Sequence, residues 1–291
     1  MNNYIEIYKR YLNSKNLSVN TVSSYIYDLK SFNNYLENNY YIEIINTKKA
    51  QILTYLVDLQ KQGKSSSTIA RTISALKNFF NYLKMEKIII ENPAMSIHSP
   101  KQVKKIPSIL SENEINILMN LPDINTFKGS RDNAILELLY SSGIKVTELI
   151  NINTKDVNLN AGIITIKGAK ERILPLSKYS KKAIINYINN FRNNKCKEDN
   201  DFLFINIYGG SISRQGIWKT LKFYEKQMDL NKELSPQVLR NSFAVHLISH
   251  GADLCTVQDL LGLTSLGATQ NYMQNIEYKS LEVFERTFPR A

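Results

Sequence analysis

The sequence predicts a mainly α-helical protein of two domains, the second of which contains a small antiparallel sheet. Three observations predict this fold class. Apolar residues recur at three- and four-residue spacing through most of residues 1–97, as on the buried face of helices. Residues 91–108 are rich in proline and lysine and have no period, whereas residues 161–177 alternate in hydrophobicity as strands do. A chain of 291 residues also exceeds what one core usually holds.

The first domain, residues 1–97, is expected to be a bundle of about four helices. An opening run covers residues 4–12, and Ser18 can cap a second helix. A third run covers residues 47–62, and a fourth begins at the serine cluster of residues 65–67. Residues 98–110 form the predicted linker. Its lysines can follow a phosphate backbone, and solvated linker lysines are the alternative.

The second domain, residues 111–291, begins with Ser111 and Glu114, which are spaced as a capping box. Helices are expected at residues 112–120 and 128–141, with a short one after the turn at residues 141–144. Residues 161–177 predict two or three strands joined by a glycine-containing turn at residues 167–170. Helical patterns return at residues 181–193, 213–229, 236–250, 254–261, 266–273 and 276–286.

The charge of the chain favours a polyanion as partner. The formal net charge is +11, and the basic excess is found on both sides of residue 100. Such a balance suits nucleic acid, and a basic surface that is only solvated is the alternative. The first residues lack the apolar segment of a signal peptide, and no apolar run reaches the roughly 18 residues of a membrane span. We therefore expect a cytoplasmic protein without a membrane partner.

Metal-dependent, nucleotide-dependent and acyl-transfer chemistry have no motif in the sequence. His98, His246 and His250 are not accompanied by HExxH or by paired carboxylates, and the two cysteines, Cys196 and Cys255, lack CxxC spacing. Neither the phosphate-binding GxxxxGK pattern nor GxSxG occurs. We expect no metal site, no cofactor and two reduced thiols.

What remains is a group of cations and one tyrosine in the second domain: Lys145, Lys167, Arg240 and Tyr272. The chain has 17 tyrosines, so Tyr272 alone indicates little, and an ordinary core or surface ring is its simplest interpretation. The segments around these four residues change that interpretation.

These segments resemble the motifs of the tyrosine recombinases, or phage integrase family, and most closely those of the Xer type. ENPAMSIHSPK resembles the interdomain linker of the family, SSGIKVTELINI its first-arginine box, KGAKERILPLS its β-hairpin lysine box, and SPQVLRNSFAVHLISHGADLCTVQDLLGLTSLGATQNYMQ its C-terminal catalytic box. LSVNTVSSYIYDLKSF and SSSTIARTISALKNFFNYL resemble helices of its core-binding domain. Because the resemblance covers essentially the whole chain in the family's order, it is more specific than any single motif.

The resemblance implies a SAM-like, four-helix core-binding domain and a mixed α+β catalytic domain that together clamp duplex DNA. Members of the family cut one strand with a tyrosine, which leaves a 3′-phosphotyrosine and a free 5′-hydroxyl, and then rejoin it to a partner strand without a metal or nucleotide. The attacked phosphodiester gains charge on its non-bridging oxygens, which guanidinium groups stabilise, and a general acid protonates the leaving oxygen.

Three residues match the family's catalytic positions. Tyr272, in TQNYMQ, falls on the nucleophile, and Arg240, in VLRNSF, falls on the second arginine. Lys167, in KGAKER, falls on the lysine that protonates the leaving oxygen. The resemblance therefore implies strand cleavage through Tyr272, assisted by Arg240 and Lys167.

Three other residues depart from the family pattern. Lys145 replaces the first arginine, so the charge is kept but the planar fork is lost. Gln237 replaces a histidine and can donate a hydrogen bond but cannot shuttle a proton. Leu263 replaces a histidine or tryptophan and offers neither a donor nor a charge. One such loss lowers a rate by roughly 10²–10⁴, and losses within one site are not additive. The catalytic site is therefore expected to be degenerate.

Two neighbouring residues bear on these departures. His246 lies six residues after Arg240, about 240° around a helix, so we expect it to face elsewhere and not to replace the missing histidine. Glu148 lies three residues after Lys145 and can pair with it, which would orient the lysine and neutralise part of its charge. An ordinary surface pair is the alternative.

DNA binding is expected to rest on distributed phosphate contacts that weaken with salt. Candidate contacts, each with plain solvated charge as the alternative, are Arg71, Lys77, Lys104, Lys105 and Arg214. The resemblance also implies a homo- or hetero-tetramer on DNA, held by a C-terminal helix over residues 276–288. It admits a second recombinase or a DNA translocase as a further partner.

Two functions stay open on the sequence. The first is a site-specific recombinase that cleaves DNA through Tyr272, and the second is a family member that binds DNA as a clamp but is impaired in cleavage, acting architecturally or beside an active recombinase. A basic helical protein unrelated to DNA is a third reading, which the full-length resemblance disfavours. Whether the chain is an active enzyme is therefore not decided by its sequence.

Overall fold

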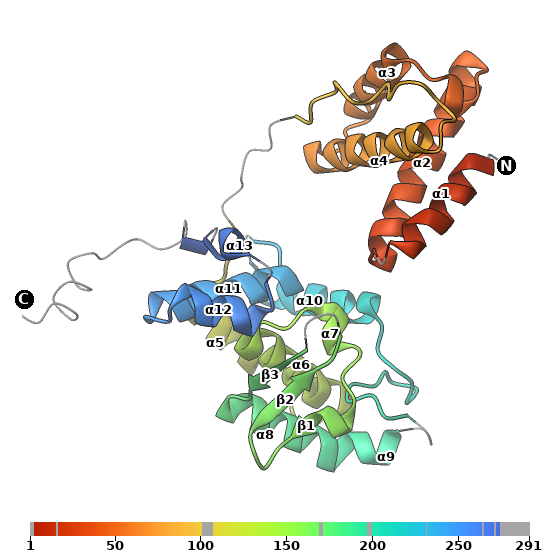
Figure 1. The fold of residues 1–291 in the computed structure, drawn as a ribbon. Helices are drawn as coiled ribbons and strands as arrows, with labels where there is room; N and C mark the ends of the chain where they lie inside the picture. The colour runs from red at the N-terminus through yellow and green to blue at the C-terminus, as the bar shows by residue number, and fades with distance from the viewer. Residues whose placement is uncertain are drawn as a thin grey trace, which may run out of the picture. The chain divides into compact units, whose positions relative to one another are not determined.

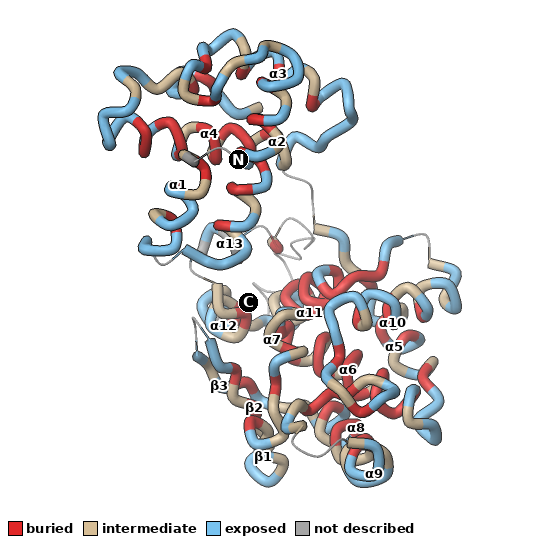
Figure 2. Tube along the Cα trace, turned by 90° about the vertical axis from the view of Figure 1, so that its right-hand side faces the viewer, coloured by how far each residue is buried: buried red, intermediate tan, exposed pale blue. Residues whose placement is uncertain are grey.

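The computed structural model divides the chain into two compact units, residues 1–104 and residues 105–291 (Figure 1). It describes residues 3–15, 17–100, 107–168, 171–196, 200–230, 232–263, 265–270 and 272–273. Each unit has its own hydrophobic core, and the buried segments of Figure 2 lie in the interior of each. The mainly helical fold class with one small antiparallel sheet is confirmed. The unit boundary lies within residues 98–110, while the domain limits that the sequence suggests stay a prediction.

The described part of the first unit contains four α-helices and one 3-10 turn. They are α1 (Asn3–Ser14), α2 (Val19–Tyr40), η1 (Ile44–Asn46), α3 (Lys49–Lys61) and α4 (Ser66–Met85). The serine cap predicted at Ser18 is present, and Ser65, in the serine cluster where a helix was predicted to begin, also caps its helix. The Oγ of Ser18 accepts a hydrogen bond from the Thr21 N–H at 3.1 Å, and the Oγ of Ser65 accepts one from the Thr68 N–H at 3.2 Å. These bonds satisfy N–H groups that a helix start otherwise leaves unpaired.

The second unit combines helices with the small sheet. Its helices are α5 (Glu112–Asn120), α6 (Phe127–Ser142), α7 (Val146–Leu149), η2 (Thr154–Asp156), α8 (Lys178–Tyr187), the π-helix η3 (Ile188–Arg192), α9 (Asn193–Lys195), α10 (Arg214–Gln227), α11 (Pro236–Ser249), α12 (Leu254–Leu261) and α13 (Leu266–Gln270). Among the described residues of both units, no helix is both long and apolar enough to cross a membrane.

Helix α6 is the centre of the second unit. It packs against α8 on one side and α11 on another, and its interior residues Ala134, Leu136 and Leu139 are fully buried. A helix that is covered on several faces has no exposed polar stripe. This packing fixes α11, which carries Arg240, relative to the Gly143 turn at the end of α6.

The sheet contains three antiparallel strands in the order β1-β2-β3, with bounds β1 (Val157–Asn158), β2 (Ile163–Ile166) and β3 (Arg172–Pro175). Strands β2 and β3 lie in the segment that the sequence predicts to be extended. Strand β1 precedes that segment and was not predicted, because two residues are too few for alternation to be visible in the sequence. The helix predicted at residues 181–193 starts earlier than expected and continues as η3 and α9. The predicted C-terminal helix lies outside the described residues.

The capping box predicted at the start of α5 is present. The Oγ of Ser111 accepts from the Glu114 N–H at 3.2 Å, and Glu114 Oε2 accepts from the Ser111 N–H at 2.6 Å. Glu114 also pairs with Lys232 Nζ at 3.2 Å. Burial alone would raise the pKa of Glu114, but the hydrogen bonds from Ser111 and Lys232 outweigh it and lower the pKa below its usual value.

A lowered pKa in the folded state makes stability depend on pH. The contribution of Glu114 is fully present above the pKa of the unfolded state and is lost as the pH falls through the folded pKa. We expect the free energy of unfolding to fall less between pH 6 and about pH 3.5 in Glu114→Gln than in the wild type, because glutamine keeps an acceptor but does not titrate. Urea unfolding monitored by the fluorescence of Trp218, the single tryptophan, measures this in the second unit.

The matched control is Asp259→Asn, which removes an exposed carboxylate of α12 that makes no ion pair within the described part of the chain. This variant should keep the wild-type dependence on pH. Equal pH dependence in Glu114→Gln and the wild type would contradict the assignment.

Candidate active site

Arg240 and Tyr272 are brought together in the second unit. Arg240 lies in the middle of α11 and is only 4% exposed. Its Nη1 donates to the Gly143 carbonyl at 2.5 Å and its Nη2 to the Leu261 carbonyl at 2.6 Å. Tyr272 follows α13 and is buried in an apolar cluster with Phe243 and Leu261. The two residues therefore interact directly, and their roles as cation and nucleophile stay predictions.

The electrostatic surroundings of Arg240 come from three charged or polar side chains. Burial lowers the pKa of Arg240, the neighbouring Tyr272 and Glu148 raise it, and the positive charge of Arg172 lowers it further. A hydrogen bond between Tyr272 and Arg240 also favours the charged guanidinium. Arginine remains protonated under all ordinary conditions, so Arg240 is a fixed positive charge beside the tyrosine hydroxyl.

Lys167 follows β2 directly and pairs with Asp156. Its Nζ lies 2.5 Å from Asp156 Oδ1, while its own side chain is 58% exposed. Asp156 Oδ2 accepts from the Asn153 N–H at 3.0 Å, so the carboxylate is held from two sides. Burial would raise the pKa of Asp156, but the hydrogen bonds from Lys167 and Asn153 outweigh it and lower the pKa. Because the Lys167 ammonium is exposed and the Asp156 carboxylate that binds it is fixed, the ammonium can contact a ligand that arrives from solvent.

Lys145 lies at the N-cap of α7 and is linked to Arg172 through one carboxylate. Lys145 Nζ is 3.9 Å from Glu148 Oε1, and the Lys145 N–H donates to Glu148 Oε2 at 3.0 Å. Arg172 binds the same carboxylate with both ends of its fork, at 2.9 Å and 2.8 Å. Burial would raise the pKa of Glu148, but these hydrogen bonds outweigh it and lower the pKa. The pairing of Lys145 with Glu148 that the sequence suggests is thus present and is weaker than the pairing of Glu148 with Arg172.

Gln237 and Leu263 also depart from the family pattern, and both side chains contact neighbouring residues. The Gln237 side chain donates from Nε2 to Asn241 Oδ1 at 2.8 Å, one turn further along α11. Leu263 is partly buried against the apolar cluster that contains Tyr272. Gln237 therefore presents a neutral amide at the start of α11, and Leu263 contributes apolar contact.

His246 lies on another part of α11 and is bonded to Tyr140. The His246 Nδ1 and the Tyr140 hydroxyl are 3.0 Å apart, and the two rings meet edge to face. Burial lowers the pKa of His246, which favours the neutral ring. Tyr140 thus engages the Nδ1 of His246, the histidine that lies nearest in the sequence to Gln237, where the family histidine is missing. Within the described residues, no cluster of three or more His, Cys, Asp or Glu side chains has the spacing of a metal site.

Two residues of this site were missed by sequence reasoning, Arg172 and Asp156. Arg172 closes the β2–β3 hairpin, because its register partner is Ile166, the residue before Lys167. Asp156 lies three residues after Asn153, the spacing of a capping pair, and eleven residues before Lys167. An arginine and a lysine at the two ends of one predicted hairpin turn were the available signal for Arg172. Nothing in the sequence indicates that Asp156 and Lys167 meet.

The predicted phosphate contacts of the first unit and linker differ in their surroundings. Arg71, on α4, binds the buried Asp28 of α2 through Nε at 2.9 Å and Nη2 at 2.8 Å. Its guanidinium is therefore already paired within the unit. Lys77 is partly buried on the same helix. Lys104 and Lys105 lie outside the described residues. All four stay predictions as DNA contacts.

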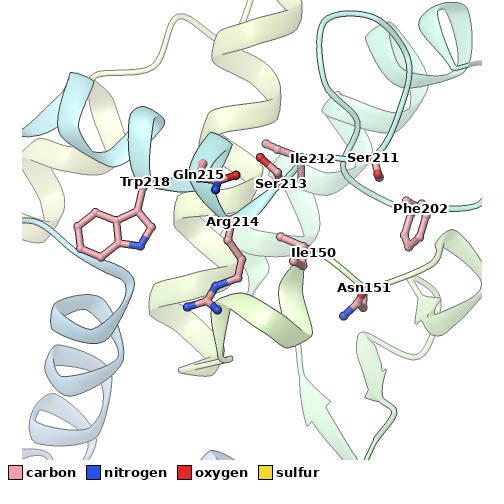
Figure 3. Close-up of a pocket in the computed structure, with 9 residues that line it drawn as sticks. All are labelled: Ile150, Asn151, Phe202, Ser211, Ile212, Ser213, Arg214, Gln215 and Trp218. Atoms are coloured by element: carbon pink, nitrogen blue, oxygen red, sulfur yellow. The ribbon is translucent and has the colours of Figure 1, made fainter. Parts of the chain in front are cut away.

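Arg214 borders a depression of about 600 Å³ on the second unit (Figure 3). It is exposed at the first position of α10, and Trp218 projects one turn later. The remaining walls come from the residues after α7, from Phe202, from the turn before α10 and from α10 itself. They are lined by Ile150, Asn151, Phe202, Ser211, Ile212, Ser213 and Gln215. A guanidinium, an indole and several amide or hydroxyl groups thus share one open surface.

Family models cover most of the chain. The model of the phage integrase family matches residues 108–278, and the model of the phage integrase N-terminal SAM-like domain matches residues 5–87. Among curated proteins, the tyrosine recombinase XerD of Staphylococcus epidermidis is 39% identical over 298 aligned residues, with all of both chains covered. The tyrosine recombinase XerD of Listeria monocytogenes is 36% identical over 297 aligned residues, again with full coverage of both chains.

Solved structures show the same fold at lower identity. The XerH site-specific recombinase, in a post-cleavage complex with its difH substrate, has a TM-score of 0.75 at 20% identity and covers 95% of this chain and 82% of its own. The Tn1549 transposon integrase, in complex with circular intermediate DNA, has a TM-score of 0.76 at 18% identity and covers 97% and 98%. Because two family models and full-length relatives match it, the chain belongs to the phage integrase family and is an Xer-type tyrosine recombinase by homology.

Proposed function

We propose that the chain is a site-specific DNA recombinase that cuts and rejoins one strand at a time through Tyr272, more slowly than family members with an intact site. The observation that carries this proposal is the hydrogen bond between Tyr272 and the buried guanidinium of Arg240. A tyrosine hydroxyl has an ordinary pKa of about 10, so it needs a neighbouring cation to react as an oxyanion near neutral pH.

In the proposed reaction, the Tyr272 hydroxyl gives up its proton to solvent, its oxygen attacks the scissile phosphorus, and the bond from phosphorus to the 5′-oxygen breaks. Arg240 stabilises the charge that develops on the non-bridging oxygens. Lys167 protonates the leaving 5′-oxygen, because its exposed ammonium is held by Asp156 and can reach a ligand from solvent. Lys145 supplies a second positive charge without the bidentate grip of an arginine. Rejoining is the same reaction in reverse, with the 5′-hydroxyl of a partner strand as the nucleophile.

The proposed substrate is duplex DNA, bound by phosphate contacts from both units. The net charge of +11 supports a polyanionic partner. The solved relatives named above are in complex with DNA, which supports the same ligand here. Arg214 and Trp218 provide a candidate contact surface on the second unit (Figure 3). We propose assembly as a tetramer on DNA through residues 276–288, in the manner that the family resemblance implies.

A second candidate function is a DNA-binding family member that does not cleave. The observation that favours it is the local engagement of the replaced residues. The Gln237 amide is bonded to Asn241, and Leu263 packs in the apolar cluster beside Tyr272. Neither residue can transfer a proton. Such a protein would hold DNA beside an active recombinase.

The two candidates differ in whether a covalent DNA adduct forms. A binding site selected from a random duplex library, rebuilt with a nick beside the scissile phosphate, traps the adduct because the short 5′-fragment diffuses away. We expect the wild type to form an adduct that migrates as a protein–DNA band under denaturing conditions, and we expect Tyr272→Phe to form none because it lacks the attacking oxygen.

The matched control is Tyr179→Phe, which removes the hydroxyl of an exposed tyrosine on α8. It should form the adduct at the wild-type rate. Sequence-specific binding by the wild type without any adduct after prolonged incubation would refute the cleaving function and leave the binding function.

Restoring the family residues should increase cleavage. In the combined variant Lys145→Arg, Gln237→His and Leu263→His, we expect the adduct to form faster by roughly 10²-fold, since a bidentate cation and proton-transferring groups are regained. Single-turnover adduct formation with saturating protein measures this independently of binding. If the variant binds DNA as tightly as the wild type and shows no gain, the three positions have been wrongly assigned.

Arg214 is expected to contribute one phosphate contact. Arg214→Ala should weaken DNA binding, and the slope of log K against log salt should become shallower by about 1. Fluorescence anisotropy titrations at several salt concentrations measure the slope. Lys178→Ala, on α8, serves as a control of the same charge change. An unchanged slope in Arg214→Ala would show that Arg214 does not contact the DNA backbone.

A further inference from the structure

Glu148 holds the Lys145 ammonium less tightly than the three-residue spacing of the two side chains would suggest. Lys145 Nζ lies 3.9 Å from Glu148 Oε1, which is beyond hydrogen-bond distance, and the side chain is 49% exposed. Glu148 follows Lys145 by three residues on α7, a spacing at which lysine and glutamate usually pair directly. Some other group must therefore compete for the carboxylate.

That group is Arg172. Its Nη1 donates to Glu148 Oε1 at 2.9 Å and its Nη2 to Glu148 Oε2 at 2.8 Å. Such a fork engages both oxygens with charge-assisted hydrogen bonds and matches the carboxylate charge with a guanidinium. Glu148 Oε2 also accepts the Lys145 N–H at 3.0 Å. The carboxylate thus binds the backbone of Lys145, while its charge is directed to Arg172.

Arg172 itself is not free to turn toward a ligand. Its Nε donates to the Leu260 carbonyl at 2.9 Å, so all three nitrogens of the guanidinium are engaged, and the side chain is 9% exposed. Gly262 packs against the same group: a Cβ there would lie 3.1–3.3 Å from Nη1, Cζ and Nε. The guanidinium is held between α7 and the end of α12. This geometry excludes a direct role at the phosphate and fits a positioning role.

We propose that Arg172 is a positioning residue that occupies Glu148 and so leaves the Lys145 ammonium available to bind the scissile phosphate. This inference rests on the proposed function for the identity of the phosphate. Lys145 depends on such a device more than an arginine would, because a lysine paired to a carboxylate keeps few donors for a second anion. Without Arg172, Glu148 would pair with Lys145 and cancel the charge that the reaction needs.

The inference is tested first on Lys145 itself. Brief treatment with an amine-acylating reagent at fixed pH, followed by mass spectrometry, gives the reactivity of Lys145 relative to the exposed Lys155. We expect Arg172→Met to lower the relative reactivity about threefold, since an ion-paired amine is less available. The double variant Arg172→Met/Glu148→Gln should return it to within about twofold of the wild type, because the competing charge is gone.

The second readout is the rate of adduct formation on the nicked DNA. We expect Arg172→Met to be slower by about tenfold and the double variant to recover at least part of that loss. Arg71→Met is the matched control for Lys145 reactivity, since Arg71 forks a buried aspartate in the other unit and should not affect it.

The outcomes separate the two proposals. If the wild type forms no adduct, the cleaving function fails, and the reactivity of Lys145 still decides the role of Arg172. If Glu148→Gln does not restore Lys145 reactivity in the Arg172→Met background, the positioning role is wrong. Where melting curves show that Arg172→Met does not fold, Arg172→Lys replaces it. A lysine lacks the two parallel N–H donors of the guanidinium fork and holds the carboxylate less firmly, so Lys145 reactivity should fall and be restored by Glu148→Gln.

Discussion

The candidate site depends on the hydrogen bonds that the last carbonyl groups of α12 accept. A helix leaves its final carbonyls without partners inside the helix. Here the Leu260 carbonyl accepts from Arg172 Nε and the Leu261 carbonyl from Arg240 Nη2. Gly262, at φ +61°, then turns the chain in a left-handed conformation that glycine adopts without strain. The chain continues from this turn to Leu263 and Tyr272, so two arginines from different elements hold the turn that precedes Tyr272.

This arrangement joins structure and chemistry in the same side chains. Arg240 connects α11 to the Gly143 turn and to α12, and Arg172 connects β3 to α7 and α12. Buried donors of this kind satisfy backbone groups and at the same time concentrate positive charge. Glu148 offsets part of that charge where it is bound by Arg172. The remainder, on Arg240 and Lys145, is the positive charge available to the proposed phosphate ligand.

The sequence predicted the elements better than the contacts between them. Periodicity placed α5 and α12 at the observed bounds, because long apolar stripes and capping residues are local signals. The resemblance placed Arg240 and Tyr272 together. It did not reveal Arg172 or the pairing of Lys167 with Asp156, because both depend on the register of the hairpin and on a loop that brings distant residues together. The two-residue strand β1 carries no periodic signal at all.

The retained residues Arg240, Lys167 and Tyr272 differ in how far folding alone accounts for their presence. Removing Arg240 would leave two carbonyls without their donor, so this residue has a role in folding besides its proposed role beside Tyr272. Lys167 is different: it is largely exposed, and its only charged partner among the described residues is Asp156. The hydroxyl of Tyr272 is likewise not needed for packing, because a phenylalanine ring would serve in the same apolar cluster. The proposal of a cleaving enzyme therefore depends on Lys167 and Tyr272 as well as on Arg240.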